Sequence, residues 1–312
     1  GDIDAMGIDI CASWAALQGM ADVLQAVCQN SKTLIICDEV HHAAVEATWG
    51  ASAYSAFNDA AYVLLLTGTP IRSDGEKSVW MAYDTKGAID HPDGGSYTIS
   101  YGECVDLGYC RPVTFHKHHG KFSVEVAPGR SLSISGYKPA ALSPEEKRSP
   151  GLQNSLKYYN LAKTPLFEND DVTPLNGCFQ WTMIEAAIAK LDDLRLRMPI
   201  AGGLVIAPNI EMAKFMADIL EILEGKRPTE VNSNLPNSST KISAFKNTDK
   251  RWIVSVGMIA EGVDIKRLRV LAFLPNSLTE LAFRQAVGRV VRSAGPNDDT
   301  RAYVVMPSFE TL

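Results

Sequence analysis

Residues 34–41, with the sequence Leu-Ile-Ile-Cys-Asp-Glu-Val-His, decide the fold. Residues 34–37 form a short, wholly apolar run, which is typical of a parallel β-strand buried on both faces. Two acidic residues, Asp38 and Glu39, follow this run directly. Because open α/β sheets bind ligands at the carboxyl ends of their strands, these carboxylates are expected at a ligand site. A strand-end turn with solvated acids is the plainer alternative.

The sequence on either side of this stretch continues the α/β pattern. A second apolar run at residues 62–66 ends in the sequence TGTP (67–70), so hydroxyl groups follow a second strand. Apolar residues spaced three and four apart predict a helix over 15–27, before the first strand. Residues 1–90 therefore resemble half of a doubly wound layer.

The rest of the chain divides into an irregular part and a regular part. Residues 91–180 are rich in turn-forming residues and predict a connector with some strands of its own. Residues 181–312 predict a complete α/β lobe. Its expected helices run from after Trp181 to residue 196 and over 210–224. Its expected strands are 203–207, 252–256, 270–274 and 302–306.

Composition excludes several classes of protein. The 312 residues are 46% hydrophobic and 21% charged, which is incompatible with a disordered or fibrous chain. No apolar run reaches the roughly 18 residues that a membrane span needs, and the N-terminus has no secretory pattern. We therefore expect a cytoplasmic protein with no membrane partner and with reduced cysteines.

Charge is distributed unevenly along the chain. The net charge is −6, but residues 1–110 contain four basic and fifteen acidic residues. Residues 241–301 contain eleven basic and six acidic residues. A basic segment near the C-terminus favours a groove for phosphates, and an ordinary solvated surface is the alternative.

A group of cysteines and histidines has the residue types of a metal site but not the usual spacing. Cys104 and Cys110 precede His116, His118 and His119. Zinc ligands usually pair with two to four residues between them, and five separate the two cysteines. Strand and loop residues are therefore the favoured interpretation, and a metal-dependent nuclease is the least favoured function.

A basic helix is predicted near the C-terminus. Residues 277–280, Ser-Leu-Thr-Glu, match a capping box that opens it. Gln285, Arg289 and Arg292 are spaced four and three apart, which places them on one face of such a helix. Arginine binds phosphate oxygens well because its planar fork stays charged.

Four strings of sequence together resemble a known family. They are DEVH (38–41), TGTP (67–70), EGVD (261–264) and QAVGRVVR (285–292). In this order they resemble the superfamily 2 helicases of the DExH type, and among these the bacterial and phage DEAD/DEAH-box proteins related to restriction-enzyme helicase subunits. The resemblance implies tandem RecA-like lobes with parallel sheets, which bind ATP between them and nucleic acid across them.

For the first lobe, the resemblance implies roles at five positions. Asp38 would organise Mg²⁺ through water, and Glu39 would be the catalytic base. His41 would couple the nucleotide site to the other lobe. Thr67 and Thr69 would link hydrolysis to movement on nucleic acid.

For the second lobe, the resemblance implies a set of nucleotide contacts. Gly262 and Asp264, in the string EGVD, match the nucleotide-contacting end of the family's motif V. Gln285, Arg289 and Arg292, in the string QAVGRVVR, match motif VI, in which the arginines reach the γ-phosphate.

Nucleic-acid contacts are implied at two serines. Ser13 is in a position where relatives have a hydroxyl that contacts the nucleic-acid strand. The hydroxyl residue that many relatives carry at the end of the strand 252–256 is Val256 here, and Ser255 is its expected substitute.

A phosphate-binding loop of the form G-x-x-x-x-G-K-[ST] is absent from the sequence. The nearest string, Gly75-Glu76-Lys77-Ser78, lacks the Gly-Lys pair. Only 37 residues precede Asp38, and residue 1 is not methionine. We expect a fragment whose first lobe is incomplete at its N-terminus; a relative that has lost hydrolysis is the alternative.

Two functional hypotheses follow. The first is an ATP-dependent helicase or translocase that uses ATP and Mg²⁺, with DNA favoured over RNA on the resemblance; this chain alone is expected to be inactive. The second is a non-hydrolysing nucleic-acid-binding or scaffold module. No residue pattern identifies a nuclease or methylase partner.

Overall fold

The computed structural model describes most of the chain in two compact units. The units are Gly1–Thr98 and Ile99–Leu312, and each is described by itself. The described residues are 9–40, 43, 48–68, 78–85, 89, 95–119, 121–127, 130–135, 162–232, 234–256, 265–276, 280–293, 295, 298 and 300–308.

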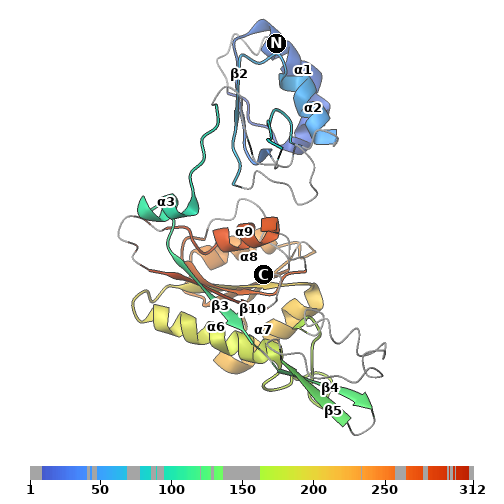
Figure 1. Ribbon diagram of the computed structural model, residues 1–312, viewed down its shortest axis with the longest axis vertical. Helices are drawn as coiled ribbons and strands as arrows, with labels where there is room; N and C mark the ends of the chain where they lie inside the picture. The colour runs from blue at the N-terminus through green and yellow to red at the C-terminus, as the bar shows by residue number, and fades with distance from the viewer. Residues whose placement is uncertain are drawn as a thin grey trace. The chain divides into compact units, whose positions relative to one another are not determined.

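The first unit contains a pair of parallel strands with helices on one face. Its elements are the 3-10 helix η2 (Trp14–Ala16), α1 (Leu17–Asn30), β1 (Leu34–Cys37), α2 (Thr48–Phe57) and β2 (Tyr62–Leu65). Helices α1 and α2 lie together beside the strands (Figure 1). Helix α1 buries Leu17, Leu24 and Cys28. The helix predicted over 15–27 is confirmed, with its bounds at Leu17 and Asn30.

One prediction for this unit is wrong. The apolar runs predicted strands buried on both faces, yet Leu34 and Ile36 of β1 are 60% and 59% exposed. Tyr62 and Leu64 of β2 are exposed on the same alternating pattern. Side chains alternate across a strand, and α1 and α2 cover one face. Among the described residues, the other face of the two strands has no such cover.

The second unit is built on a six-stranded parallel sheet. The strand order is β3-β10-β9-β6-β8-β7, and each adjacent pair is parallel. The strands are β3 (Val113–His118), β6 (Gly202–Ala207), β7 (Thr229–Val231), β8 (Trp252–Val256), β9 (Leu268–Phe273) and β10 (Ala302–Pro307). Strands β4 (Lys121–Ala127) and β5 (Arg130–Ser135) form a separate antiparallel hairpin.

Helices cover both faces of this sheet. The helices of this unit are α3 (Tyr101–Asp106), α6 (Phe179–Arg195), α7 (Ile210–Glu224), α8 (Ser238–Lys246) and α9 (Glu280–Gly288), of which the last four cover the sheet. Helices α6 and α7 lie on one face, and α8 and α9 lie on the other (Figure 1). Every residue of β6 and β9 is buried because a core lies on each side. The predicted α/β class is confirmed. None of the described helices is long and apolar enough to cross a membrane.

Helix α7 shows how local sequence sets its bounds. The Asn209 side chain accepts a hydrogen bond from the Met212 amide and caps the first turn. Gly225 ends the helix in the left-handed region, with φ 69°. Between these residues, Met212, Phe215 and Met216 are buried against the sheet. The helix therefore spans the predicted range of 210–224.

Part of the predicted connector over 91–180 belongs to the sheet of the second unit. Strand β3 lies within that range but pairs in parallel with β10 over six residues, from Val113 to His118. This pairing makes β3 the edge strand of the second unit's sheet, and Val113 packs against its core. The first unit ends at Thr98. The hydrogen bonds of β3, which the periodicity of the sequence does not reveal, assign that strand to the second unit.

Replacing Gly203 with alanine tests the packing of β6. A Cβ at Gly203 would lie 2.1 Å from the Trp252 ring, so we expect Gly203→Ala to lower the free energy of unfolding by about 1–3 kcal/mol. Gly102→Ala in α3 is the matched control, since its Cβ would have no contact closer than 3.9 Å. Urea denaturation followed by circular dichroism measures both; equal midpoints for the two variants would refute the steric argument.

Candidate functional site

The two acidic residues after β1 are located by contacts from neighbouring segments. The Trp14 indole donates a hydrogen bond of 3.0 Å to the backbone carbonyl of Asp38. The Asp38 carboxylate is exposed, and its Oδ1 accepts the amide of Glu39 at 3.0 Å. The carboxylate is therefore oriented by the backbone that follows it. The sequence pattern indicates Ser13 but not its neighbour Trp14, because the contact with Asp38 joins residues 24 positions apart.

Glu39 has a strained backbone. Its φ is 50°, in the left-handed region that residues with a Cβ rarely adopt. Such a conformation costs about 1–2 kcal/mol in a non-glycine residue. Strain of this kind clusters at functional sites, where the surrounding structure enforces it. The chain turns sharply at Glu39, immediately after the strand.

The ends of the two strands in the first unit lie side by side. Cys37 is in register with Leu65, and the Leu66 amide donates to the Cys37 carbonyl at 2.8 Å. The Val40 amide then donates to the Leu66 carbonyl at 3.2 Å. These bonds bring the segment of Asp38 and Glu39 next to the partly buried Thr67. His41 and Thr69 lie outside the described residues.

Ser13 has a structural contact. Its hydroxyl accepts a hydrogen bond of 3.3 Å from the Ala16 amide and caps η2. This cap precedes Trp14, whose indole reaches Asp38. Ser13 therefore lies in the segment that contacts the acidic pair, and its contact with nucleic acid stays a prediction.

In the second unit, the predicted basic helix is shorter than expected. Helix α9 ends at Gly288, so Arg289 and Arg292 follow the helix and do not continue its face. The amides of Arg289 and Val290 bond to carbonyls three residues back, which tightens the chain into a turn. Gln285 remains on the helix. The predicted cap residues 277–279 lie outside the described residues.

The environments of these three side chains differ. Gln285 is partly buried, and its Oε1 is buried without a hydrogen-bond partner among the described residues. Arg289 is partly buried and Arg292 is exposed. Val290 and Val291 are buried in the core beneath them. Val290 and Val291 thus face the core, although the segment 289–292 turns away from helical geometry.

Ser255 does not lie at the surface. It is 2% exposed within β8, between its neighbours β6 and β7. The burial argues against a contact between its side chain and a nucleic-acid strand in this conformation. The partly exposed Val256 ends the strand. Gly262 and Asp264 lie outside the described residues.

The cysteine and histidine group has ordinary packing contacts. His118 Nε2 lies 2.9 Å from the Thr182 hydroxyl, and its ring meets Phe179 edge-on. Burial lowers the pKa of His118 to about 4, with a smaller contribution from His119. His116 stacks on Tyr303. Within the described part of the chain, no three His, Cys, Asp or Glu side chains are arranged to hold a metal ion.

A buried polar network lies next to the segment after α9, and no local pattern in the sequence indicates it. Arg111, 1% exposed, forms an ion pair with Asp298 at 2.6 Å. Arg269 shares the same Asp298 carboxylate at 2.9 Å. Burial lowers the pKa of the Arg269 guanidinium to about 10, with Arg111 adding to that effect and Asp298 opposing it.

Comparison with known proteins identifies the class of the second unit. Residues 187–294 match the helicase conserved C-terminal domain family, so the second unit contains a helicase-like C-terminal domain. A fragment from Vibrio vulnificus, assigned as an HsdR subunit of a type I restriction enzyme, shares the fold. The aligned region covers 88% of this chain and 43% of the Vibrio vulnificus chain, with a TM-score of 0.51 and 18% identity. The resemblance to superfamily 2 helicases is confirmed, and the six-stranded sheet resembles the RecA-like lobe of helicases.

Curated relatives are similar along most of the chain. An uncharacterized protein of Mycobacterium tuberculosis is 34% identical over 283 residues, which are 90% of this chain and 43% of the relative. A protein of a Sulfolobus islandicus filamentous virus, assigned as a helicase, is 26% identical over 83% of this chain and 40% of its own length. The chain thus spans less than half the length of these relatives.

Glycine at position 39 tests the backbone strain. Because glycine adopts positive φ without a Cβ clash, we expect Glu39→Gly to be about 1 kcal/mol more stable than Glu39→Ala. Both variants lack the carboxylate, so their difference isolates the backbone. Thermal unfolding of the two proteins measures it, and an alanine variant at least as stable as the glycine variant would contradict a left-handed Glu39.

The pH dependence of unfolding tests the burial of His118. His118 binds a proton more weakly in the folded protein, with a pKa of about 4, than at its ordinary value of 6.5. Its contribution to stability is therefore fully present above about pH 6.5 and is lost as the pH falls toward 4. His118→Phe keeps an aromatic ring against Phe179 but does not titrate. Urea titrations should show a shallower fall of stability in this variant; identical slopes would mean that His118 is not buried neutral.

Proposed function

We propose that the natural protein carrying this chain is an ATP-dependent nucleic-acid helicase or translocase of superfamily 2. The observation that carries the proposal is the location of Asp38 and Glu39. They lie at the carboxyl end of β1, beside the end of the parallel strand β2. Ligands of α/β sheets bind at such an edge. The helicase-like C-terminal domain at residues 187–294 supports the same conclusion.

The acidic pair fits a hydrated magnesium ion and a nucleotide. Carboxylate oxygens are the hard ligands that Mg²⁺ prefers, and the Asp38 carboxylate is exposed and oriented by the Glu39 amide. Asp38 would hold the ion through water. The bound ion would neutralise charge on the phosphates during their transfer.

Glu39 is proposed to accept the proton of the attacking water. Its backbone turns at φ 50° immediately after the strand, and it directly follows the exposed Asp38. Two adjacent carboxylates can then serve two roles, metal binding and proton transfer. Thr67, next to this segment, is proposed to respond to the nucleotide.

The basic residues of the second unit are proposed to contact phosphate. Arg289 and Arg292 would stabilise negative charge that develops on the transferred group. Gln285, with its buried amide oxygen, would assist them. The excess of basic residues over 241–301 suits a phosphate backbone. DNA is the proposed substrate on the resemblance to restriction-enzyme helicase subunits.

Replacing Glu39 tests the catalytic role. In the complete natural protein, we expect Glu39→Gln to abolish ATP hydrolysis stimulated by nucleic acid while ATP binding is retained, because the amide cannot accept a proton. Asp22→Asn, which removes an exposed carboxylate of α1, is the control and should hydrolyse ATP at the wild-type rate. Phosphate release and fluorescent-nucleotide binding measure the two properties. Normal turnover by Glu39→Gln would exclude Glu39 as the base.

The same assay separates the alternative function. A non-hydrolysing module would show no ATPase activity in its complete natural form, with DNA or with RNA. Its nucleic-acid binding would weaken with added salt and would not respond to ATP. Comparing stimulation by DNA with stimulation by RNA tests the choice of substrate.

A further inference from the structure

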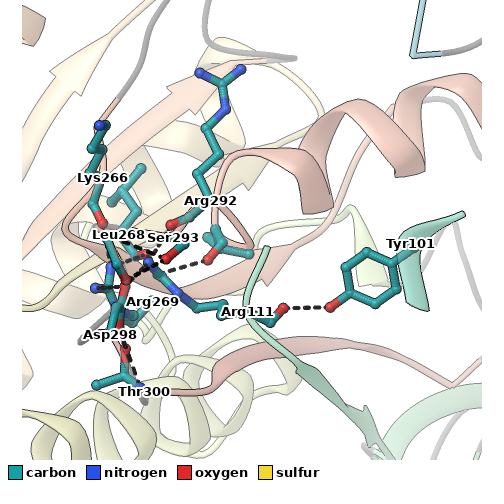
Figure 2. A network of polar contacts seen from close by, with 11 residues as sticks. Tyr101, Arg111, Lys266, Leu268, Arg269, Arg292, Ser293, Asp298 and Thr300 are labelled. Atoms are coloured by element: carbon teal, nitrogen blue, oxygen red, sulfur yellow. Dashed lines mark hydrogen bonds and ion pairs between the residues drawn. The ribbon is translucent and has the colours of Figure 1, made fainter. Parts of the chain in front are cut away.

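Arg111 contacts four groups that are distant from it in sequence. Its Nη1 donates to the carbonyls of Leu268 and Val290 at 2.9 and 3.1 Å. Its Nη2 donates to the Arg292 carbonyl and to the Asp298 carboxylate. The side chain is fully buried. Figure 2 shows these contacts converging on the Arg111 guanidinium.

The backbone around Arg111 is tied to the same segment. The Arg111 amide donates to the Val291 carbonyl at 2.7 Å, and the Ser293 amide donates to the Tyr109 carbonyl at 3.3 Å. Cys110 and Arg292 form an isolated antiparallel bridge. Residues 290–293 therefore bond to residues 109–111 through both backbone and side chain.

This segment needs such bonds because α9 has already ended. Beyond Gly288, the amides of Arg289, Val290 and Val291 still bond to carbonyls of the last helical turn. No continuing helix supplies amides to the carbonyls of Val290 and Arg292, because α9 ends at Gly288. Buried carbonyls require donors, and Arg111 provides them at Val290 and Arg292. The direction of the chain after the helix thus depends on Arg111.

An arginine is suited to this position for two reasons. Its planar fork donates in several directions at once, whereas a lysine ammonium is a compact point charge. Its charge is also balanced locally: burial lowers the pKa of the Arg111 guanidinium, and Asp298 raises it. Asp298 is itself shared with Arg269 and bonded to Thr300, so the acceptor is held in place.

Arg292 shows the consequence for the proposed site. Its carbonyl faces Arg111, while its guanidinium points away from the network (Figure 2). The side chain is exposed, so the region that it can reach is set by its anchored backbone. A displacement of about 1 Å at a catalytic group can cost a hundredfold in rate.

We propose that Arg111 is a positioning residue for Arg289 and Arg292: by binding the carbonyls of Val290 and Arg292, it fixes the backbone from which these two arginines reach phosphate. The positioning role rests on the proposed function of the two arginines. The anchoring of residues 290–293 does not depend on that function, and it is measured separately.

The test uses Arg111→Lys in the complete natural protein. Lysine keeps the positive charge beside Asp298 but cannot span the three carbonyls. We expect kcat for ATP to fall about tenfold or more, with little change in KM, because the two arginines act on charge that develops in the transition state. Arg111→Met, which also removes the charge, should lower kcat at least as much. All assays are run well below the unfolding midpoint of each variant.

Arg267→Lys is the matched control. Arg267 is 6% exposed and donates to the carbonyls of Phe245 and Ile200, in the same unit but away from residues 290–293. Its replacement should lower stability while kcat stays near the wild-type value. An equal loss of kcat in Arg267→Lys would show a general effect of destabilisation and would overturn the proposal.

Hydrogen exchange distinguishes failure of the inference from failure of the proposed function. We expect amides 290–293 to exchange faster in Arg111→Lys, while those of β6 stay protected. If Arg292→Ala abolishes turnover but Arg111→Lys has the wild-type kcat and exchange, the positioning role is wrong and the function stands. If the wild-type protein lacks ATPase activity, or Arg292→Ala retains it fully, the proposed function is wrong. In that case, hydrogen exchange tests only whether Arg111 anchors the backbone of residues 290–293.

Discussion

In the β1–β2 pair of the first unit and in the six-stranded sheet of the second, neighbouring strands run in the same direction, and this constraint places the candidate residues. In the first unit, the pairing of Cys37 with Leu65 brings the acidic pair beside the segment of Thr67. In the second unit, the parallel sheet requires connections that return across its faces, and α9 belongs to one of them. Parallel pairing therefore gathers residues that are far apart in sequence at the ends of strands.

The two units differ in how their strands are covered. Strand β6 is buried along its whole length because helices pack on both faces of its sheet. Strand β1 is equally apolar in sequence, but Leu34 and Ile36 are exposed. An apolar run indicates which strands can be buried on both faces. Whether each face is covered depends on the elements that pack there.

Elements with local signals could be predicted to the residue, as α7 shows. Asn209 supplies a side-chain oxygen to the first turn, and Gly225 adopts the left-handed conformation that ends the helix. Helix α9 also ends at a glycine, Gly288, but this residue does not adopt the left-handed conformation. The spacing of Phe283, Ala286, Val287 and Val290 suits a longer helix, yet the chain turns after Gly288 and still buries Val290. The side chain that binds this turn, Arg111, lies 179 positions from Val290 and 181 from Arg292.

The sequence by itself determined the α/β class, the acidic pair at a strand end and the helicase resemblance, because each depends on short patterns of neighbouring residues. Only the tertiary structure decided that β3 belongs to the second unit, that Ser255 is buried, that Trp14 contacts Asp38 and that Arg111 binds the segment after α9. These features depend on hydrogen bonds and burial between distant segments. Such contacts leave no periodic pattern along the chain, so no local reading of the sequence could reveal them.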